Sequence, residues 1–238
     1  MEQKARFLRT RLLPLLTVAF GCLGLVWGST NLGQSIVAAD FWDVEAQLLR
    51  FENFSQAASV RTLESGAAQS LSPCDSHSQR ALLLMELPLA DANLRSGATS
   101  DFDRRVQSLE TRTRRILSCT PRDSFAWLVA FGLEARRGIS ARSFDLLAAS
   151  YETSPREAWI GLRRMIVAIP LALSAPEHIQ RMILDEFQSL VQYRLVEIPA
   201  RLYFNAPAEI RALLDSRIEQ LSPSSKKLFS EELARLRP

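Results

Sequence analysis

A short phrase that occurs twice constrains the fold of this chain more than any other feature. It reads TPRDSFAW from Thr120 and SPREAW from Ser154, so the two copies begin 34 residues apart. In each, a hydroxyl residue precedes a proline. This order is typical of a helix start, where the hydroxyl caps backbone N–H groups and the proline loses no hydrogen bond. Asp123 and Glu157 lie three residues after the predicted caps, as in a capping box. The phrase therefore predicts two helix starts separated by one helical hairpin.

The residues after the first copy resemble the tetratricopeptide repeat, a helix–turn–helix unit of the same period that stacks on its neighbours. Trp127 and Pro155 match the tryptophan and proline of that repeat, while Ser143 and Leu147 keep the size classes of its Ala and Phe positions. The Leu, Gly and Tyr positions hold other residues, and the match covers about one repeat, residues 121–155. The resemblance implies a repeat core made of Trp127, Phe131, Leu147 and Trp159.

Helical periodicity continues on both sides of this hairpin. The segment from Pro176 to Ile198 carries its apolar residues on one face, and Ser72-Pro73 and Ser222-Pro223 repeat the predicted helix start. No segment shows the apolar–polar alternation of a half-buried strand. We predict an all-α fold of antiparallel, tetratricopeptide-like hairpins, arranged either as a solenoid or as an irregular bundle.

The N-terminal region holds an uncharged apolar run from Leu12 to Trp27, which extends to 21 residues if it is continued to Leu32. This length predicts a transmembrane helix over 12–32. The alternative is a signal peptide cleaved before Asp40. Basic residues before the run place the N-terminus in the cytoplasm. Arginine-rich composition is typical of GC-rich bacteria, so we predict a single-pass inner-membrane protein with most of its chain in the periplasm.

These patterns divide the chain into four parts. The predicted parts are a basic cytoplasmic tail over 1–11, the anchor over 12–32, a juxtamembrane segment over 33–52, and a periplasmic all-α domain over 53–238.

The chain has a net charge of +3 and a pI of about 9.0, and its excess of basic residues lies in the tail. Four of the 29 basic residues and one of the 26 acidic residues precede the apolar run, which leaves 25 of each sign in the remainder. A neutral remainder lacks the excess of cations with which proteins bind phosphate backbones. We therefore predict no nucleic-acid partner, and a lipid bilayer as partner of residues 12–32.

The chain contains no motif of a hydrolase, a zinc protease or a nucleotide-binding loop. His77 and His178 lie far apart in sequence, and neither has neighbours at metal-ligand spacing. We predict a protein that is not an enzyme and that binds no metal or cofactor.

Arginines occur in adjacent pairs along the predicted helices, including Arg163-Arg164. If three of these helices were neighbours, arginines could line a groove for an anionic glycan, a lipid headgroup or an acidic protein. The other interpretation is a solvated face that nearby carboxylates balance. The candidate anionic-ligand surface comprises Arg104, Arg105, Arg114, Arg115, Arg136 and Arg137.

Two of the three cysteines are predicted to form a disulfide. Cys22 lies inside the apolar run, which leaves Cys74 and Cys119 as the pair in the outward part of the chain. Both lie beside predicted helix starts, and an up-down array places those starts at the same end. The alternative is two free thiols.

The layout of basic tail, single span and helical domain resembles bacterial envelope proteins found with surface-polysaccharide assembly systems. This resemblance implies a non-catalytic scaffold or adaptor for a membrane protein complex. The second hypothesis is a periplasmic glycan-binding module that uses the arginine pairs.

Overall fold

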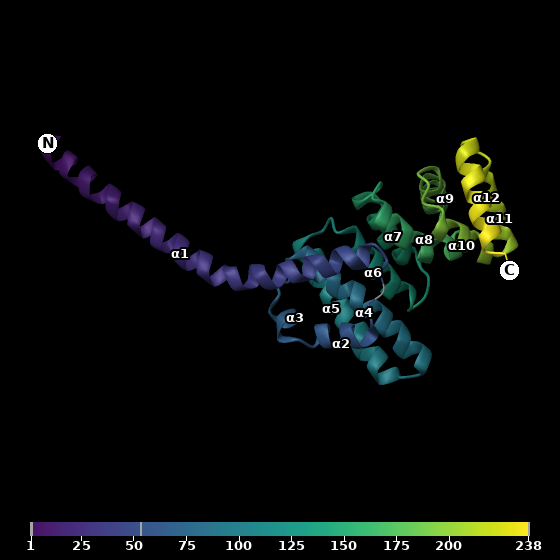
Figure 1. Ribbon diagram of the computed structural model, residues 1–238, viewed down its shortest axis with the longest axis horizontal. Helices are drawn as coiled ribbons and strands as arrows, with labels where there is room; N and C mark the ends of the chain where they lie inside the picture. Colours follow the sequence, from purple (N-terminus) through teal and green to yellow (C-terminus); the bar gives the residue numbers. More distant parts are fainter. Residues whose placement is uncertain (1, 53, 238) are drawn as a thin grey trace.

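A computed structural model describes residues 2–52 and 54–237, with the side chains of residues 2–13 and 30–35 outside this description. Within the described ranges the chain is helical and holds no strand, which confirms the predicted all-α class (Figure 1). The helices are α1 (Glu2–Leu49), α2 (Gln56–Leu63), α3 (Gly66–Ser70), α4 (Ser76–Ser96), α5 (Thr99–Cys119), α6 (Ser124–Ala135), α7 (Ala141–Thr153), α8 (Ala158–Ala168), the 3-10 turn η1 (Ile169–Leu171), α9 (Glu177–Gln192), α10 (Glu197–Asn205), α11 (Ala208–Ile218) and α12 (Pro223–Arg235).

Helix α1 has two halves in different surroundings. Its 48 residues form one helix without a break, about 70 Å long at 1.5 Å per residue. The C-terminal half lies against α4 and buries Phe41 and Leu48, which lie on the same face of α1 two turns apart. The N-terminal half projects from the body of the molecule (Figure 1). The helix therefore crosses the three predicted boundaries that fall between residues 11 and 40 without changing its secondary structure.

The predicted transmembrane anchor is wrong. Among the helices as far as the structure describes them, none combines the length and the apolar content needed to cross a bilayer. The uncharged run from Leu12 to Trp27 would extend only about 24 Å as a helix, whereas the hydrocarbon core is about 30 Å thick. Continuing it to Leu32 adds Gly, Ser, Thr and Asn, and the side chains of residues 12–13 and 30–32 lie outside the description. The single-pass inner-membrane topology inferred from this run falls with it.

Helices α4 to α7 form a consecutive up-down array in which each helix packs on the one before it. Their connections are short, as expected for antiparallel neighbours. Gly97 ends α4 in the left-handed conformation, with φ of 73°, which glycine adopts without strain. Ser140 caps α7 through a capping box with Ser143. The hairpin predicted around the repeated phrase is thus α6 and α7.

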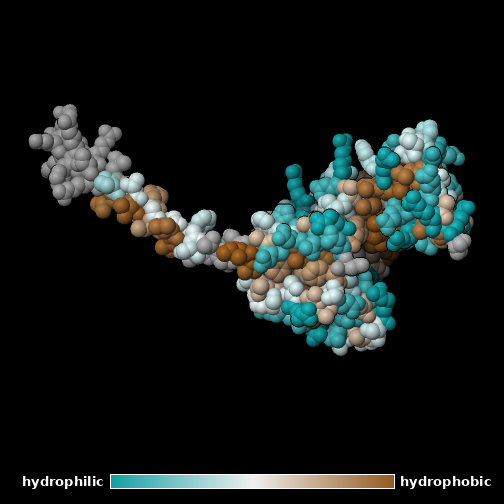
Figure 2. All heavy atoms as spheres, in the orientation of Figure 1, coloured by the Kyte–Doolittle hydropathy of each residue, from teal (hydrophilic) through white to brown (hydrophobic). Residues whose placement is uncertain are grey.

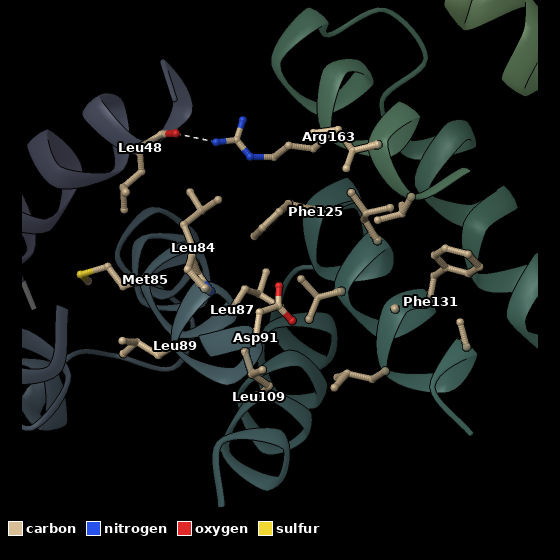
Figure 3. Close-up of a pocket in the computed structure, with 18 of the residues that line it drawn as sticks. Leu48, Leu84, Met85, Leu87, Leu89, Asp91, Leu109, Phe125, Phe131 and Arg163 are labelled. Atoms are coloured by element: carbon tan, nitrogen blue, oxygen red, sulfur yellow. Dashed lines mark hydrogen bonds between the residues drawn. The ribbon is translucent and has the colours of Figure 1, made fainter. Parts of the chain in front are cut away.

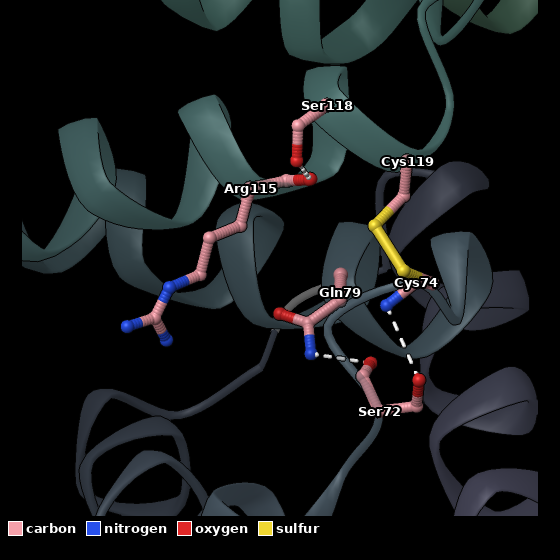
Figure 4. The surroundings of a disulfide bond; sticks show 6 residues. All are labelled: Ser72, Cys74, Gln79, Arg115, Ser118 and Cys119. Atoms are coloured by element: carbon pink, nitrogen blue, oxygen red, sulfur yellow. Dashed lines mark hydrogen bonds between the residues drawn. A yellow bond between two sulfur atoms is a disulfide. The ribbon is translucent and has the colours of Figure 1, made fainter.

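The predicted disulfide between Cys74 and Cys119 is present and joins the two ends of the α4–α5 hairpin (Figure 4). The two Cα atoms lie 5.2 Å apart, within the range that a disulfide spans. The Ser72 hydroxyl accepts from the Cys74 amide, and the Ser72 carbonyl accepts from the Gln79 side chain. Closing this loop of 45 residues constrains the unfolded chain by roughly 4 kcal/mol in the loop-entropy model.

Three of the helix starts differ from their prediction. The caps are Asp75, Asp123 and Glu157, each three residues after the hydroxyl residue predicted for that role. The Asp123 amide donates to the Thr120 carbonyl at 3.0 Å, so the proline lies in a turn before the helix. Asp123 then accepts from the Ala126 amide. Ser222 is the cap of α12, with proline at the first helical position, as predicted.

The predicted repeat core has two buried and two half-buried members. Phe131 and Leu147, on α6 and α7, are buried in the shared core. Trp127 and Trp159 are half-buried, and the Trp127 indole donates to the Pro121 carbonyl at 2.8 Å. The Trp159 ring lies 6.0 Å from the ring of Phe125 and so connects α8 with α6.

The C-terminal helices extend the body away from α1 (Figure 1). Helix α9 is amphipathic and packs against α8, α11 and α12. Phe187 of α9 and Tyr203 of α10 both make edge-to-face contacts with Phe229 of α12, at centroid distances of 5.9 and 5.7 Å. This aromatic cluster joins three helices whose sequences do not repeat one another.

Candidate binding cavity and its charged neighbours

A cavity of about 810 Å³ lies between α1, α4, α6 and α8 (Figure 3). Its volume falls within the roughly 300–1,000 Å³ typical of small-molecule sites. Leucines, phenylalanines and methionine from these helices form most of the wall, including Leu48, Leu84, Met85, Phe125 and Phe131. The cavity is therefore an apolar site lined by helices that are distant in sequence.

The wall of the cavity follows from the position of α4. The apolar side chains from Ala81 to Met85 are buried on every side of α4, because this helix is surrounded by α1, α2 and α5. Leu84 and Met85 of this run face the cavity, and Leu89 continues the wall one turn later. Gly132 lines the opposite wall on α6, and a Cβ placed there would meet no atom within 4 Å.

The mouth of the cavity exposes apolar side chains to solvent. Phe51 is 40% exposed, and both Ile139 and Ile166 are 44% exposed. Side chains this exposed present apolar surface that a bound ligand could cover. The cavity is thus open at a rim formed by the end of α1, the α6–α7 turn and α8.

Most charges at the cavity are compensated by carboxylate–guanidinium pairs. Arg136 donates to Asp91 at 2.8 Å and lies over the Phe102 ring, 5.0 Å from its centroid. Glu52 pairs with Arg50 at 2.6 Å. These pairs leave Arg163 as the remaining charged side chain of the lining.

Arg163 has neutral partners. Its Nη2 donates to the Leu48 carbonyl, and its Nη1 lies 3.4 Å from the carbonyls of Leu49 and Trp159. The guanidinium stacks 4.1 Å from the centre of the Phe51 ring. Within the described ranges no carboxylate forms an ion pair with it. Burial lowers the pKa of Arg163 to about 10, so the side chain is still a cation at neutral pH.

Arg164, the next residue, lies on the inner side of α8 and is fully buried. Its Nε donates to Glu186 of α9 at 3.0 Å, and its two terminal nitrogens donate to the carbonyls of Ser150 and Ser154 at 2.7 and 2.9 Å. The guanidinium lies 4.5 Å from the centre of the Tyr151 ring. Burial raises the pKa of Glu186, while the hydrogen bonds from Arg164 oppose that shift.

A second charge network fixes the docked half of α1. Glu45, buried on α1, pairs with Arg80 of α4 and accepts from His77 Nδ1 at 2.7 Å. Arg80 also pairs with Asp123 at 2.8 Å and lies over the Trp159 ring. Asp123, the cap of α6, is thereby connected to α1 through one arginine. This network binds three helices at the end of the body where α1 arrives.

The six arginines predicted as an anionic-ligand surface do not form one groove. Arg104 pairs with Asp101, and Arg105 lies 3.6 Å from the buried Glu86. Arg136 pairs with Asp91 as above, and Arg137 pairs with Glu110 and Glu134. Arg114 and Arg115 are exposed on α5. Four of the six arginines therefore have carboxylate partners. Two of these four arginines lie on α5, and the other two lie at the end of α6.

Metal ligands are not clustered in the part of the chain that the structure describes: it holds no group of three His, Cys, Asp or Glu side chains that could bind an ion. His77 contacts Glu45, and its ring centroid lies 5.5 Å from that of Trp42 with the two rings tilted by 55°. This histidine belongs to the network that holds α1.

Comparison with known proteins found no match: no family description, no curated protein and no solved structure corresponds to this chain.

The cavity and the role of Arg163 were missed by the sequence-based prediction. The available signal was the pair Arg163-Arg164 inside an otherwise apolar helix, flanked by Leu162 and Met165. Neighbouring residues point about 100° apart on a helix, so a pair of charges with apolar residues on both sides is expected to turn one of them toward the core. That pattern indicates that at least one arginine is buried, but it does not say which carboxylate, if any, lies opposite.

Proposed function

We propose that this protein is a non-catalytic scaffold that holds a partner protein through the projecting half of α1. We call residues 14–29 of α1 the arm. The observation that carries the proposal is the exposure of its apolar side chains, which reaches 74% for Phe20 and 76% for Leu25 (Figure 2). Contiguous exposed apolar surface of this kind marks interaction sites.

The partner surface is an apolar helix of another protein. Gly21, Gly24 and Gly28 recur at intervals of three and four residues along the arm, and a Cβ at any of them would meet no atom within 4 Å. Positions at this spacing lie on one side of a helix. Glycine there permits close approach of a second helix, while the larger side chains beside it supply contact area.

The body supports this role by holding the arm in a defined direction. The Glu45–Arg80–Asp123 network and the burial of Phe41 and Leu48 attach α1 to α4 and α6. An arm on a continuous helix loses little freedom on binding, because its backbone is already ordered. Stacked hairpins of tetratricopeptide type would extend the body as a second contact surface.

The predicted connection with surface-polysaccharide assembly depended on a layout that included a membrane span, and none of the helices, as far as the structure describes them, is long and apolar enough to form one. The glycan-binding alternative needs arginines gathered with unpaired charge, whereas four of the six have carboxylate partners.

Site-specific photo-cross-linking in the native host tests the proposal. A benzoylphenylalanine at Leu25 should give one discrete adduct with a second protein, and the same residue at Tyr193, 78% exposed at the end of α9, should not. Gly24→Leu should abolish the adduct from position 25 by preventing close approach. Equal adducts from positions 25 and 193, or an adduct that contains only two copies of this chain, would overturn the scaffold proposal.

A further inference from the structure

The apolar cavity and Arg163 together define a second binding site, separate from the arm. The cavity is lined by α1, α4, α6 and α8, whereas the arm ends 19 residues before Leu48 and projects away from the body (Figure 1). Among the charged side chains of the lining, Arg163 alone lacks a partner of opposite charge within the described residues, because Asp91 pairs with Arg136 and Glu52 pairs with Arg50.

The position of Arg163 suits a single anionic group. Figure 3 shows its guanidinium at one edge of the cavity, beside the Leu48 carbonyl and above Leu84 and Phe125. Stacking on Phe51 and the bond to Leu48 fix its orientation. Backbone carbonyls accept its hydrogen bonds but do not neutralise its charge. A guanidinium has five N–H donors, and two of the three contacts that Arg163 makes are long, at 3.4 Å, so a carboxylate can replace them.

The rest of the cavity suits an unbranched hydrocarbon chain. Its walls are side chains of helices whose backbone groups are already hydrogen-bonded within each helix. An extended peptide would bring N–H and C=O groups that find no partners on such walls, and unpaired buried groups are costly. A hydrocarbon chain has no such groups. It can lie along the apolar wall, which includes Phe125, Leu109 and Leu133.

We propose that the cavity binds a single-chain fatty carboxylate, with the carboxylate at Arg163 and the alkyl chain between α4 and α6. The ligand's negative charge compensates the one unpaired cation of the lining, and its chain covers the apolar rim at Phe51 and Ile166.

Calorimetric titration of the full chain with laurate, below its micellar concentration, tests this site. Dodecyltrimethylammonium, which has the same chain and the opposite charge, is the matched ligand. Laurate should bind one molecule per chain, at least about tenfold more tightly than the cation, as expected for a charge-assisted contact. Equal affinities, absence of laurate binding, or binding of many molecules per chain would overturn the proposal.

Two pairs of variants separate the head group from the chain. Arg163→Gln should weaken laurate binding by about tenfold and leave the cation unchanged, and Arg163→Lys should retain the preference for laurate. Gly132→Leu places a side chain in the open space of the cavity wall and should abolish binding of both ligands, whereas Gly132→Ala should bind both. Laurate binding that survives Gly132→Leu would place the ligand outside the cavity, for example on the arm, and would refute the inference. The arm and its partner would be unaffected by that result.

Discussion

Arg163 and Arg164 are adjacent on α8, yet they lie on two sides of that helix in opposite electrostatic surroundings. On the inner side, Arg164 is fully buried and pairs with Glu186, and backbone carbonyls satisfy its remaining donors. On the cavity side, Arg163 is half-buried and contacts only carbonyls and aromatic rings. On the inner side, between α7, α8 and α9, the protein supplies the counter-charge of the arginine, whereas on the cavity side it does not.

This difference shows how burial and compensation work together. A buried cation costs several kcal/mol unless a counter-charge and hydrogen bonds replace water. Arg164 obtains both from the protein, so we expect it to serve stability. Arg163 obtains hydrogen bonds without a counter-charge, which leaves its electrostatic compensation to solvent or to a ligand. The following substitutions test whether the two sides differ in this way.

Arg164→Met should have the largest effect. It leaves Glu186 buried without its cation, and breaking a buried pair in this manner typically costs about 3–5 kcal/mol. Urea unfolding of the full chain measures the loss. Adding Glu186→Leu should recover much of it, because the double variant has no uncompensated charge. A loss below that of Arg163→Met would contradict the assignment of the inner side as the stabilising one.

Gly161→Ala should be the next largest. Gly161 lies on the inner side of α8, where an added Cβ would come 2.9 Å from Oε1 of Glu186. The carboxylate must then shift from its position beside Arg164, at a cost of about 1–3 kcal/mol. Gly132→Ala on α6 is the matched control, because its Cβ meets nothing within 4 Å and alanine favours a helix by up to about 1 kcal/mol. The free energy of unfolding should fall for Gly161→Ala and rise for Gly132→Ala. Changes of the same sign would show that Glu186 is not held tightly.

The inner side should also show an alkaline pH dependence through Tyr151. Burial, and then the charge of Glu186, raise the pKa of Tyr151 well above its usual range. In the unfolded chain the phenol ionises near pH 10, whereas the folded protein keeps it protonated. Its contribution to stability is therefore complete below pH 10 and is lost as the pH rises toward the folded pKa.

Comparison with Tyr151→Phe isolates this contribution. By pH 11 the free energy of unfolding of the wild type should have fallen, relative to that of the variant, by about 1.4 kcal/mol from its value at neutral pH. Other groups titrate in both proteins and cancel in the difference. Phenylalanine keeps the buried ring and removes only the hydroxyl, so the variant should remain folded at neutral pH. Parallel curves for the two proteins would mean that Tyr151 reaches solvent.

Arg163→Met should have the smallest effect on stability. The variant loses the hydrogen bond to the Leu48 carbonyl and the stacking on Phe51, which together amount to about 1 kcal/mol. Thermal unfolding measures the change. A loss comparable to that of Arg164→Met would show that the protein supplies a counter-charge on the cavity side as well.

Much of the local structure could be predicted from the sequence, with one systematic shift. The helix starts after Ser72, Thr120 and Ser154 were predicted at the hydroxyl residue and occur three residues later, at the acid. A proline after Ser or Thr fits the first position of a helix and equally the second position of a turn. Both interpretations leave the backbone donors satisfied, so the sequence does not distinguish them.

The sequence by itself determined the all-helical class, the α6–α7 hairpin and the pairing of Cys74 with Cys119. These features depend on periodicity, on turn residues and on the small number of cysteines, all of which can be read locally. Only the tertiary structure decided that Phe20 and Leu25 are exposed while Leu82 and Leu83, equally apolar, are buried. It also decided which arginine of the α8 pair faces Glu186, because the compensation of a buried charge depends on a helix 22 residues away in sequence and on the space that its neighbours leave open.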